Sequence, residues 1–129
     1  MSMVVAAARG CVGVRFRPQG RDPATGLDCV GLVAVALAAA GARVVVPVGY
    51  ALRGGDPGDV AAVLVAAGLR GVTKAQAGDV MVCRSGPGAL HLGVDGGGSV
   101  IHADAGARRV VERPGAAPWP VIARWRWEG

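Results

Sequence analysis

The first half of the chain is organised by apolar runs of helical length that are separated by polar punctuation. Residues 3–12 form a helix candidate of small side chains. Residues 15–26 carry two prolines and two glycines, which indicates an ordered loop. Asp28 is a favourable N-cap for a second helix over residues 29–40, and Gly41 follows in the position where helices commonly end. The pattern therefore predicts two helices joined by a structured loop.

A third helix is expected further along the chain. The segment that begins at Arg43 has no helical period and is expected to cross the molecule in an extended conformation. Either Asp56 or Asp59 is a suitable N-cap for the apolar run that comes next, and Gly68 ends that run.

The second half of the chain changes to short apolar runs that are split by glycine- and proline-rich turns. This pattern is typical of strands in an antiparallel meander. In the last run, small and aromatic residues alternate with arginines, which predicts one core-facing and one solvent-facing side. Helices followed by strands predict a single α+β domain over residues 1–129, with helices packed on one face of a small antiparallel sheet. The expected strands are 78–84, 89–94, 99–103, 108–112 and 121–127.

Composition narrows the class of protein. Hydrophobic residues make up 52% of the chain and charged residues 18%, so the sequence is not of the disordered type. The three cysteines, at positions 11, 29 and 83, form neither a disulfide framework nor a CxxC motif. The net charge is +5, but the arginines are dispersed and aromatic residues are only 4% of the chain, which argues against nucleic-acid binding. A basic surface is compatible with an anionic polymer such as the cell wall.

The N-terminus lacks the positive start of a signal peptide, and Arg9 interrupts its apolar stretch. The longest uncharged apolar run, residues 29–42, is too short to span a bilayer. We therefore expect a soluble protein without membrane insertion, made in the cytoplasm without a signal peptide.

Cys29 is the first candidate for chemistry. A buried structural cysteine is the commoner situation, and Cys29 opens an apolar run. It also falls in the first turn of its predicted helix, where the positive end of the helix dipole favours the thiolate. A nucleophilic role requires a base elsewhere in the chain.

The two histidines of the chain lie in one predicted hairpin. If Val94 pairs with Ser99 across the turn, residue 91 lies directly opposite residue 102, on the same face and with Cβ atoms roughly 4.5–5.5 Å apart. Gly93 shares that face and leaves room for the rings, whereas the side chains of Leu92 and Ile101 point to the opposite face. One imidazole can then hydrogen-bond and orient the other.

These residues together form a possible Cys-His-His triad. His91 is expected to take the proton of Cys29, and His102 to fix the tautomer of His91. We expect the Cys29 sulfur within about 4 Å of a His91 ring nitrogen. Two alternatives remain: a structural histidine pair, and a zinc site of Cys29, Cys83, His91 and His102, although these positions lack the usual zinc-ligand spacing. Cys83 and Cys11 are otherwise interpreted as packed core residues, and no metal or cofactor is expected.

The sequence resembles the NlpC/p60-type cell-wall peptidases, a papain-like family. It is most similar to the compact version encoded in the tail-gene clusters of phages and phage-like gene-transfer particles. The resemblance runs from near the N-terminus to about residue 113, in family order. Its matching stretches are "AARG", "RFRPQGRDPATGLDCVGLV", "AGDVMVCRSG", "GALHLGV" and "VIHADAGARRVVE".

The resemblance implies a papain-like NlpC fold, in which the cysteine helix packs on a sheet that carries both histidines. It implies Cys29 as nucleophile, His91 as general base and His102 as orienting residue. The implied reaction is hydrolysis of a stem-peptide amide of peptidoglycan through an acyl-enzyme. The implied location is the tail of a phage or phage-like particle, with tail-tip or baseplate proteins as partners.

Several positions near the nucleophile depart from the family pattern. Phe16 stands where many members have a tyrosine near the substrate, and Val30 where many have a serine. Pro18 replaces a histidine that phage-type members often carry. Two further residues are candidates for oxyanion or substrate binding. Gln19 is either a second oxyanion donor or a plain loop residue, and Asp28 is first a helix cap and second a substrate contact.

The leading hypothesis is a peptidoglycan-degrading thiol endopeptidase that acts from a phage-like tail. The departures at Phe16 and Val30 motivate one rival, a catalytically weak structural tail protein on the same fold. A thiol acyltransferase is the other rival, because an acyl-enzyme can be resolved by water or by another nucleophile.

Overall fold

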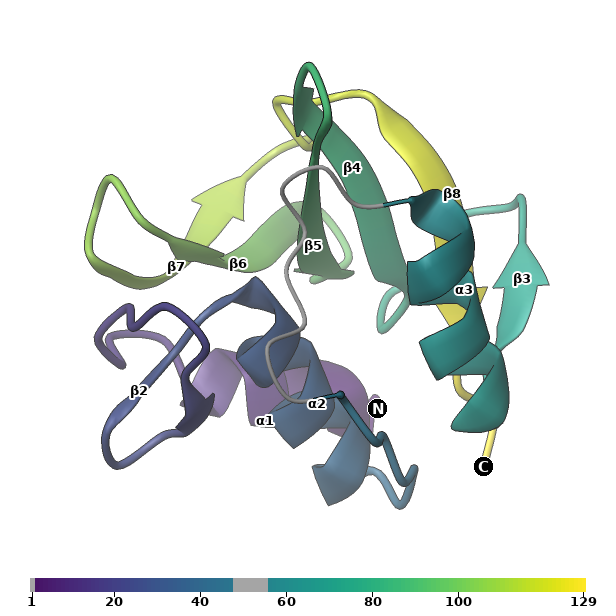
Figure 1. Cartoon of the computed structure of the whole chain (residues 1–129), viewed down its shortest axis with the longest axis horizontal. Coiled ribbons are helices and arrows are strands. Elements are labelled where there is room, and N and C mark those ends of the chain that lie inside the picture. The colour runs from purple at the N-terminus through teal and green to yellow at the C-terminus, as the bar shows by residue number, and fades with distance from the viewer. Residues whose placement is uncertain (1, 48–55) are drawn as a thin grey trace.

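The computed structural model describes residues 2–47 and 56–129 and shows three helices against a curved sheet (Figure 1). The fold is α+β, as the sequence predicts, with its helices first and most of its strands after them. The helices are α1 (Met3–Gly10), α2 (Cys29–Ala39) and α3 (Pro57–Ala66). The strands are β1 (Arg21–Asp22), β2 (Gly26–Leu27), β3 (Arg70–Val72), β4 (Val80–Gly86), β5 (Ala89–Asp95), β6 (Ser99–Asp104), β7 (Arg109–Pro114) and β8 (Val121–Arg126).

The helices begin where side-chain caps satisfy their first backbone N–H groups. Ser2 caps α1, Asp28 caps α2 through the N–H of Gly31, and Asp56 caps α3 through the N–H of Gly58. Of the two caps proposed for α3, Asp56 is therefore the one used. Past the end of α2, Gly41 has a φ of 101°, the left-handed conformation that glycine adopts easily. The expected extended segment after Arg43 lies partly outside the described residues, and residues 42–47 have no regular structure.

The larger sheet has the strand order β3-β8-β4-β5-β6-β7. Strands β4 to β7 form the predicted antiparallel meander, but the expectation that the last strand simply continues it is wrong. Strand β8 crosses back to pair with β4, and β3, which the pattern did not predict, pairs with β8. Both are non-local pairings that the alternation of residues cannot reveal. Residues 21–26 of the expected loop, together with Leu27, hold a small sheet of β1 and β2.

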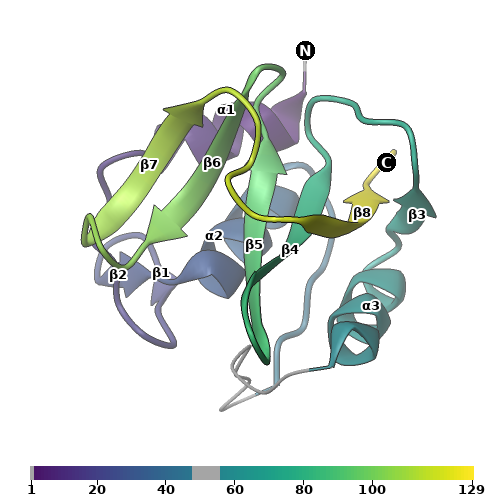
Figure 2. The same cartoon turned by 90° about the horizontal axis from the view of Figure 1, so that it is seen from above.

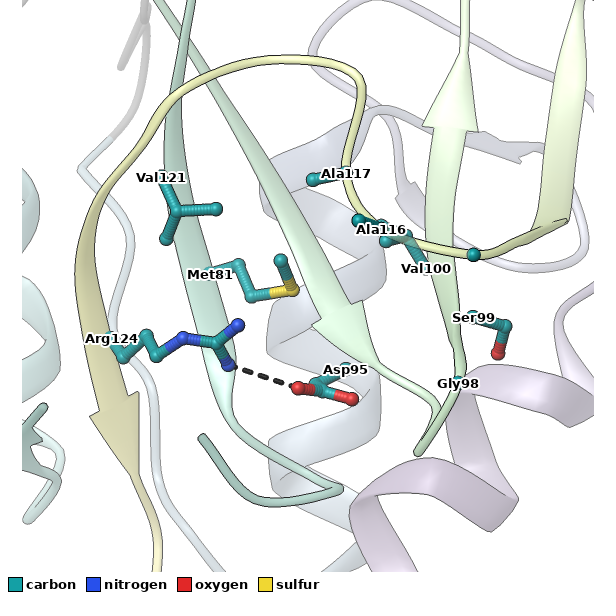
Figure 3. A pocket seen from close by; sticks show the side chains of 10 residues that line it. Met81, Asp95, Gly98, Ser99, Val100, Ala116, Ala117, Val121 and Arg124 are labelled. Atoms are coloured by element: carbon teal, nitrogen blue, oxygen red, sulfur yellow. Dashed lines mark hydrogen bonds and ion pairs between the residues drawn. The ribbon is translucent and has the colours of Figure 1, made fainter. Parts of the chain in front are cut away.

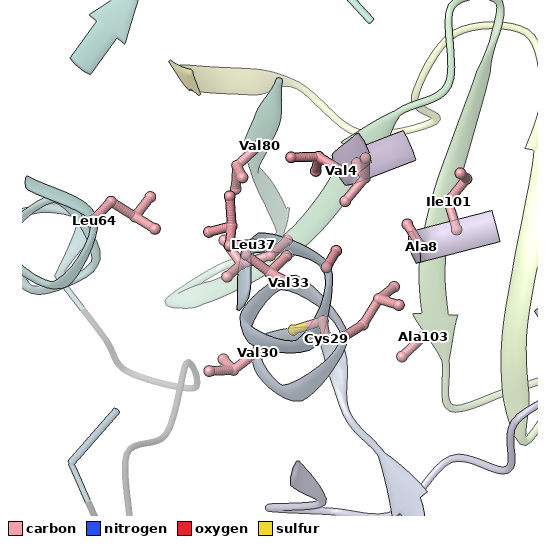
Figure 4. Close-up of a cluster of buried hydrophobic side chains, with 14 of the residues drawn as sticks. Val4, Ala8, Cys29, Val30, Val33, Leu37, Leu64, Val80, Ile101 and Ala103 are labelled. Atoms are coloured by element: carbon pink, nitrogen blue, oxygen red, sulfur yellow. The ribbon is translucent and has the colours of Figure 1, made fainter. Parts of the chain in front are cut away.

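One face of the larger sheet packs against the helices and forms the main core (Figure 4). Leu92 and Val94 of β5 and Ile101 of β6 belong to this core together with Cys29 at the start of α2. In β8, Ala123, Trp125 and Trp127 pack on the same core, whereas Arg124 and Arg126 form ion pairs with aspartates. The predicted alternation of this strand is therefore confirmed.

The opposite face of the sheet carries a smaller cluster. Met81, Cys83 and Val100 are buried there, and Trp119 packs over them. Because Cys83 is the direct partner of His91 across β4 and β5, the histidine projects from this second face. The two faces of β5 thus separate the helix core from a histidine-bearing surface.

Candidate active site

The hairpin that carries both histidines has a different register from the predicted one. Val94 pairs with Ile101 and not with Ser99, so the pairing is displaced by two residues. The reason is the turn, where Gly97 and Gly98 both take positive φ values, 83° and 141°, and make a tight loop. His91 and His102 are consequently not directly opposite each other. A displacement of two residues preserves the face, however, and the predicted common face is confirmed.

Strands β5 and β6 separate soon after this turn. Their pairing consists of Val94 with Ile101 and Asp95 with Val100, and no further β5–β6 pair forms in the described part of the chain. Figure 2 shows the two ribbons diverging from the turn. We call the opening between residues 90–92 of β5 and residues 102–104 of β6 the β5–β6 fork.

The amide of Leu92 faces this fork. The backbone of Asp95 exchanges hydrogen bonds with residues 78 and 79 on the β4 side, at 2.8 and 2.9 Å. Backbone groups alternate in direction along an antiparallel strand, so those of Leu92 point the other way, toward β6. In a closed ladder they would pair with β6, and here the backbone of Leu92 favours the thiolate of Cys29.

Cys29 is positioned by the first turn of α2, and its side chain is only 8% exposed. Burial raises the pKa of the thiol to about 12. The N–H groups of Leu92, Val30 and Cys29 favour the thiolate, but the Asp28 carboxylate opposes it and burial outweighs all of them. The expected lowering of the thiol pKa at the helix start is therefore wrong for this structure, because removal from water dominates over the helix end.

The two imidazoles form a hydrogen-bonded pair. His91 Nε2 lies 2.9 Å from His102 Nδ1, with the rings nearly perpendicular. Gly93 lies beside this pair, and a Cβ there would press on Val100 Cγ1 at 2.9 Å while making an ordinary contact with His102 Cβ at 3.7 Å. The bond occupies Nε2 of His91 and leaves Nδ1 as the nitrogen available to a thiol. No hydrogen bond joins Cys29 Sγ to either imidazole among residues 2–47 and 56–129, and their expected approach stays a prediction.

Trp119 covers the imidazole pair. Its ring centroid lies 4.7 Å from that of His91 and 5.0 Å from that of His102, edge-on to both. The tryptophan stands in residues 115–120, which we call the covering segment. The segment is held at both ends, since Gly115 donates to the Gly98 carbonyl at 2.8 Å and Arg84 donates to the Pro120 carbonyl at 3.0 Å. Prolines on either side of Trp119 restrict its backbone.

This cover keeps the imidazoles neutral. Burial lowers the pKa of His91 to about 4, and the neighbouring His102 adds to the effect. The pKa of His102 is also lowered, again first by burial, although Asp104 opposes the shift. At neutral pH the site therefore holds a neutral thiol and two neutral imidazoles.

Asp28 and Gln19 form one polar connection before the helix. The Asp28 carboxylate accepts from the backbone N–H groups of Gly31 at 2.8 Å and Gln19 at 3.0 Å, and from Arg21 Nη1 at 2.6 Å. Its predicted role as N-cap is confirmed. Because three donors already bind it, this carboxylate stabilises the loop before α2. Gln19 has a φ of 60°, which places its backbone N–H on Asp28.

Phe16 and Val30 both pack against the core. Phe16 is half-buried, and its backbone bridges to Leu27. Val30 is 7% exposed and lines a cavity of about 20 Å³ with Val33, Val60 and Leu92. A role of either side chain in substrate binding stays a prediction.

The other two cysteines are buried, as expected for packed residues. Cys11 caps the end of α1, and burial raises the pKa of Cys83 to about 11. Within the described ranges, no group of three or more histidine, cysteine or acidic residues is arranged to hold a metal ion. The same ranges contain no helix long and apolar enough to cross a membrane.

A separate cavity of about 360 Å³ lies on the second face of the sheet, toward the β5–β6 turn (Figure 3). Its apolar wall includes Met81, Val100 and Val121, and its floor holds the ion pair of Arg124 with Asp95 at 2.9 Å. The cavity is bounded by the covering segment but does not include either histidine.

Two contributors to the site were missed by sequence reasoning. Trp119 had a local signal, since it is a tryptophan between two prolines, but nothing in the sequence shows that its loop crosses the histidines. The influence of the Leu92 backbone on the Cys29 thiol had none, because it depends on how segments distant in the sequence pack.

The fold is shared with several solved structures. The NlpC1 protein of Trichomonas vaginalis matches at a TM-score of 0.70 with 20% sequence identity over 96% of this chain. The peptidoglycan hydrolase RipB of Mycobacterium tuberculosis matches at 0.64 with 25% identity over 96%, and the NlpC/p60 domain of the peptidoglycan hydrolase SagA at 0.60 with 27% over 87%. The chain spans 44% of the Trichomonas chain, 62% of the RipB chain and 86% of the SagA chain.

No family model and no curated protein matches the sequence. The likeness is thus one of three-dimensional structure, and it extends over almost all of the chain. The chain has the fold of NlpC/p60 domains, a fold that peptidoglycan hydrolases use.

Proposed function

We propose that this protein is a cysteine peptidase that hydrolyses an amide bond of peptidoglycan stem peptides. The observation that carries the proposal is the hydrogen-bonded pair of His91 and His102 in a fold that peptidoglycan hydrolases share, with Cys29 at the start of α2. The backbone of Leu92 favours the Cys29 thiolate, and His91, the residue before Leu92, lies with its Nε2 2.9 Å from His102 Nδ1. The approach of Cys29 to His91 is part of the proposal. The shared fold with peptidoglycan hydrolases supports the substrate class.

The histidine pair sets the direction of proton transfer. For His91 to act as a base through Nδ1, Nε2 must carry the hydrogen and donate it to His102 Nδ1. His91 Nδ1 then takes the thiol proton while the sulfur forms a bond to the substrate carbonyl carbon. When the amide C–N bond breaks, the imidazolium returns that proton to the leaving amine. Water resolves the thioester with His91 again as base.

The oxyanion is stabilised by the start of the helix. In the first turn of α2, the N–H of Gly31 is used by the Asp28 cap, whereas the backbone N–H groups of Cys29 and Val30 favour the thiolate. Backbone N–H donors at a helix start are suited to a developing oxyanion. Gln19 is proposed as a second donor from the preceding loop.

Cleavage of purified peptidoglycan tests the proposal. The wild-type chain is expected to release stem-peptide fragments with new amino and carboxyl ends, and Cys29→Ala to release none. Mass spectrometry of the fragments identifies the bond. If both proteins release equal amounts, the proposed activity is wrong.

A structural protein with little activity is the second candidate, and a specific observation favours it. Burial of Cys29 raises the pKa of its thiol to about 12, which disfavours the reactive thiolate. On this reading wild type and Cys29→Ala are equally inactive, but both still bind to their assembly. A thiol acyltransferase is distinguished by its products, because it leaves a new acyl adduct in place of a free acid.

We further propose that the protein acts from the tail of a phage or phage-like particle, beside tail-tip or baseplate proteins. This location rests on the similarity of the sequence to compact tail-encoded peptidases. Detection of the protein in purified particles by mass spectrometry tests it, and consistent absence from intact particles would exclude it.

A further inference from the structure

Four arginines from two distant segments come together beside the candidate site. Arg15 and Arg109 are direct antiparallel partners in an isolated bridge. The adjoining residues hold the two segments together, since Phe16 donates to the Arg108 carbonyl at 2.9 Å and Val110 donates to the Val14 carbonyl at 2.8 Å. Arg17 follows two residues after Arg15. We call Arg15, Arg17, Arg108 and Arg109 the arginine cluster.

Three of these side chains share one face. Arg15 and Arg17 are two residues apart in an extended segment, and both run past Gly26, where a Cβ would lie 2.6 Å from Arg17 Cβ and 3.4 Å from Arg15 Cγ. Residues directly opposite in an antiparallel bridge project to the same side, so Arg109 joins them. All four arginines of the cluster are exposed.

In the part of the chain that the structure describes, no carboxylate forms an ion pair with the cluster, although Asp104 is the cross-strand partner of Arg109 in the β6–β7 ladder. Elsewhere in the fold, arginines are paired with carboxylates, in the pairs Arg9–Glu112, Arg21–Asp28, Arg70–Glu128, Arg124–Asp95 and Arg126–Asp79. No member of the arginine cluster makes an ion pair within residues 2–47 and 56–129. Like charges placed directly opposite each other in a sheet destabilise the fold. The Arg15–Arg109 pair is therefore unfavourable for the fold, and Asp104 opposite Arg109 offsets part of that repulsion.

Arg108 adds a second unfavourable feature. It has a φ of 61°, in the left-handed region where glycine or asparagine is easier to accommodate. A long cationic side chain thus stands at a turn position that favours a small residue.

The cluster lies on both sides of the candidate site along the chain. Arg17 donates its backbone N–H to the Leu27 carbonyl at 3.1 Å, two residues before Cys29. Arg108 and Arg109 follow the end of β6, the strand that carries His102. An anion held by the cluster is therefore held close to the start of α2.

We propose that the arginine cluster binds the carboxylates of peptidoglycan peptides and holds the strand beside Cys29. The proposal rests on the function proposed above and names the charged part of its substrate. Guanidinium groups bind carboxylates through paired hydrogen bonds, and a patch of one sign steers an anionic polymer toward the site. Single-stranded nucleic acid fits less well, because the aromatic side chain within these two segments, Phe16, packs against the core and offers no stacking surface.

Binding of the inactive chain to insoluble peptidoglycan tests the cluster. Two proteins are sedimented with purified peptidoglycan at low salt. The parent carries Cys29→Ala, and the cluster variant carries Arg15→Gln and Arg109→Gln in addition. The control carries Arg43→Gln plus Arg84→Gln, which removes two exposed arginines outside the cluster. We expect the cluster variant to bind at least about tenfold more weakly and the control to change less than about twofold. Equal losses in both variants overturn the proposal.

Two further arms identify the ligand. The Cys29→Ala protein is expected to bind peptidoglycan with amidated carboxylates at least about tenfold more weakly than native peptidoglycan. Unchanged binding to the amidated polymer overturns the carboxylate assignment. The parent is also tested with a single-stranded DNA probe at the same salt. Tighter binding to the DNA than to native peptidoglycan would assign the cluster to nucleic acid instead.

Thermal unfolding separates a binding role from a structural one. Relief of charge repulsion is expected to leave the melting temperature of Arg15→Gln plus Arg109→Gln equal to or above that of the parent. A lower melting temperature together with weaker binding contradicts the proposal. Binding is measured without cleavage, so the two proposals can fail separately. An inactive wild type would refute only the proposed activity. Normal cleavage, with equal peptidoglycan binding by the parent and the cluster variant, would refute only this inference.

Discussion

Trp119 packs edge-on against His91, with the two ring centroids 4.7 Å apart. The indole also meets His102 at 5.0 Å, so one side chain shields both partners of the imidazole hydrogen bond. Water that reached this bond would compete for His91 Nε2 and release the ring from its orientation. Trp119 is accordingly a positioning residue for the proposed base.

Replacing Trp119 by alanine is expected to raise the pKa of His91 by about one unit, because the ring becomes solvated. The imidazole titration is followed by NMR in the Cys29→Ala background. The groups that act on His91 in the native protein are His102 and Asp104, which both variants retain. Trp119→Phe keeps an aromatic cover and is expected to shift the pKa less. A His91 titration that is identical in all three proteins would show that the indole has no influence on the ring.

Stability is expected to depend on pH through His91. The pKa of this group is about 4 in the folded state and 6.5 without the protein environment, so the unfolded chain binds more protons between these values. The contribution of the neutral His91 ring to the free energy of unfolding is complete above pH 6.5 and is lost as the pH falls toward 4. The loss at pH 4.5 is about 2.5 kcal/mol. Urea unfolding of wild type and His91→Gln at pH 7.5 and 4.5 measures it, and a parallel pH dependence in both proteins would be evidence against it.

The pH–rate profile is expected to be broad. At pH 7 His91 is already unprotonated and able to act as a base, and it becomes protonated only near pH 4. The thiol pKa of about 12 places its own ionisation far above neutrality. We expect kcat/KM on a soluble muropeptide to stay level from about pH 5 to pH 9 and to fall below that range. A bell-shaped profile centred near neutrality would instead indicate a thiolate–imidazolium pair.

Gly31 is expected to be intolerant of a methyl group. A Cβ there would lie 2.0 Å from the Gly20 carbonyl oxygen, which also accepts from the Asp28 N–H at 3.3 Å. Gly31→Ala should therefore lower the unfolding free energy by about 2 kcal/mol or more, although alanine is the better helix former.

Gly10→Ala is the matched control for this substitution. Gly10 ends α1, and nothing lies within 4 Å of an added Cβ. The control is expected to be neutral or stabilising by a few tenths of a kcal/mol. If both alanine variants were equally stable, the close approach of the Gly20 loop to α2 would not be a constraint on the fold.

Local signals predicted the helices well. Asp28 and Gly41 bracket α2 because a cap and a helix end are decided by neighbouring residues. The shared face of His91 and His102 was also correct, although the register differs by two residues. Side chains repeat every second position along a strand, so an even displacement changes the partner and keeps the face.

Non-local features were out of reach of the sequence. The pairing of β8 with β4 joins residues about forty positions apart, and no local pattern selects between it and the meander. The direction of the Cys29 pKa shift was predicted from the helix start alone. Burial, which decides it, arises from segments that meet only in the folded chain. Trp119 enters the site for the same reason.

The β5–β6 fork gives the turn between these strands an influence on residues far from it. The angle between the two arms is fixed near their apex, where Gly97 and Gly98 turn the chain and Gly96 donates to the Ser99 carbonyl at 2.9 Å. A small rotation at the turn produces a larger displacement at the far ends of β5 and β6. Substitutions at the glycine turn are thus a way to adjust the spacing of the two imidazoles while both histidines stay native.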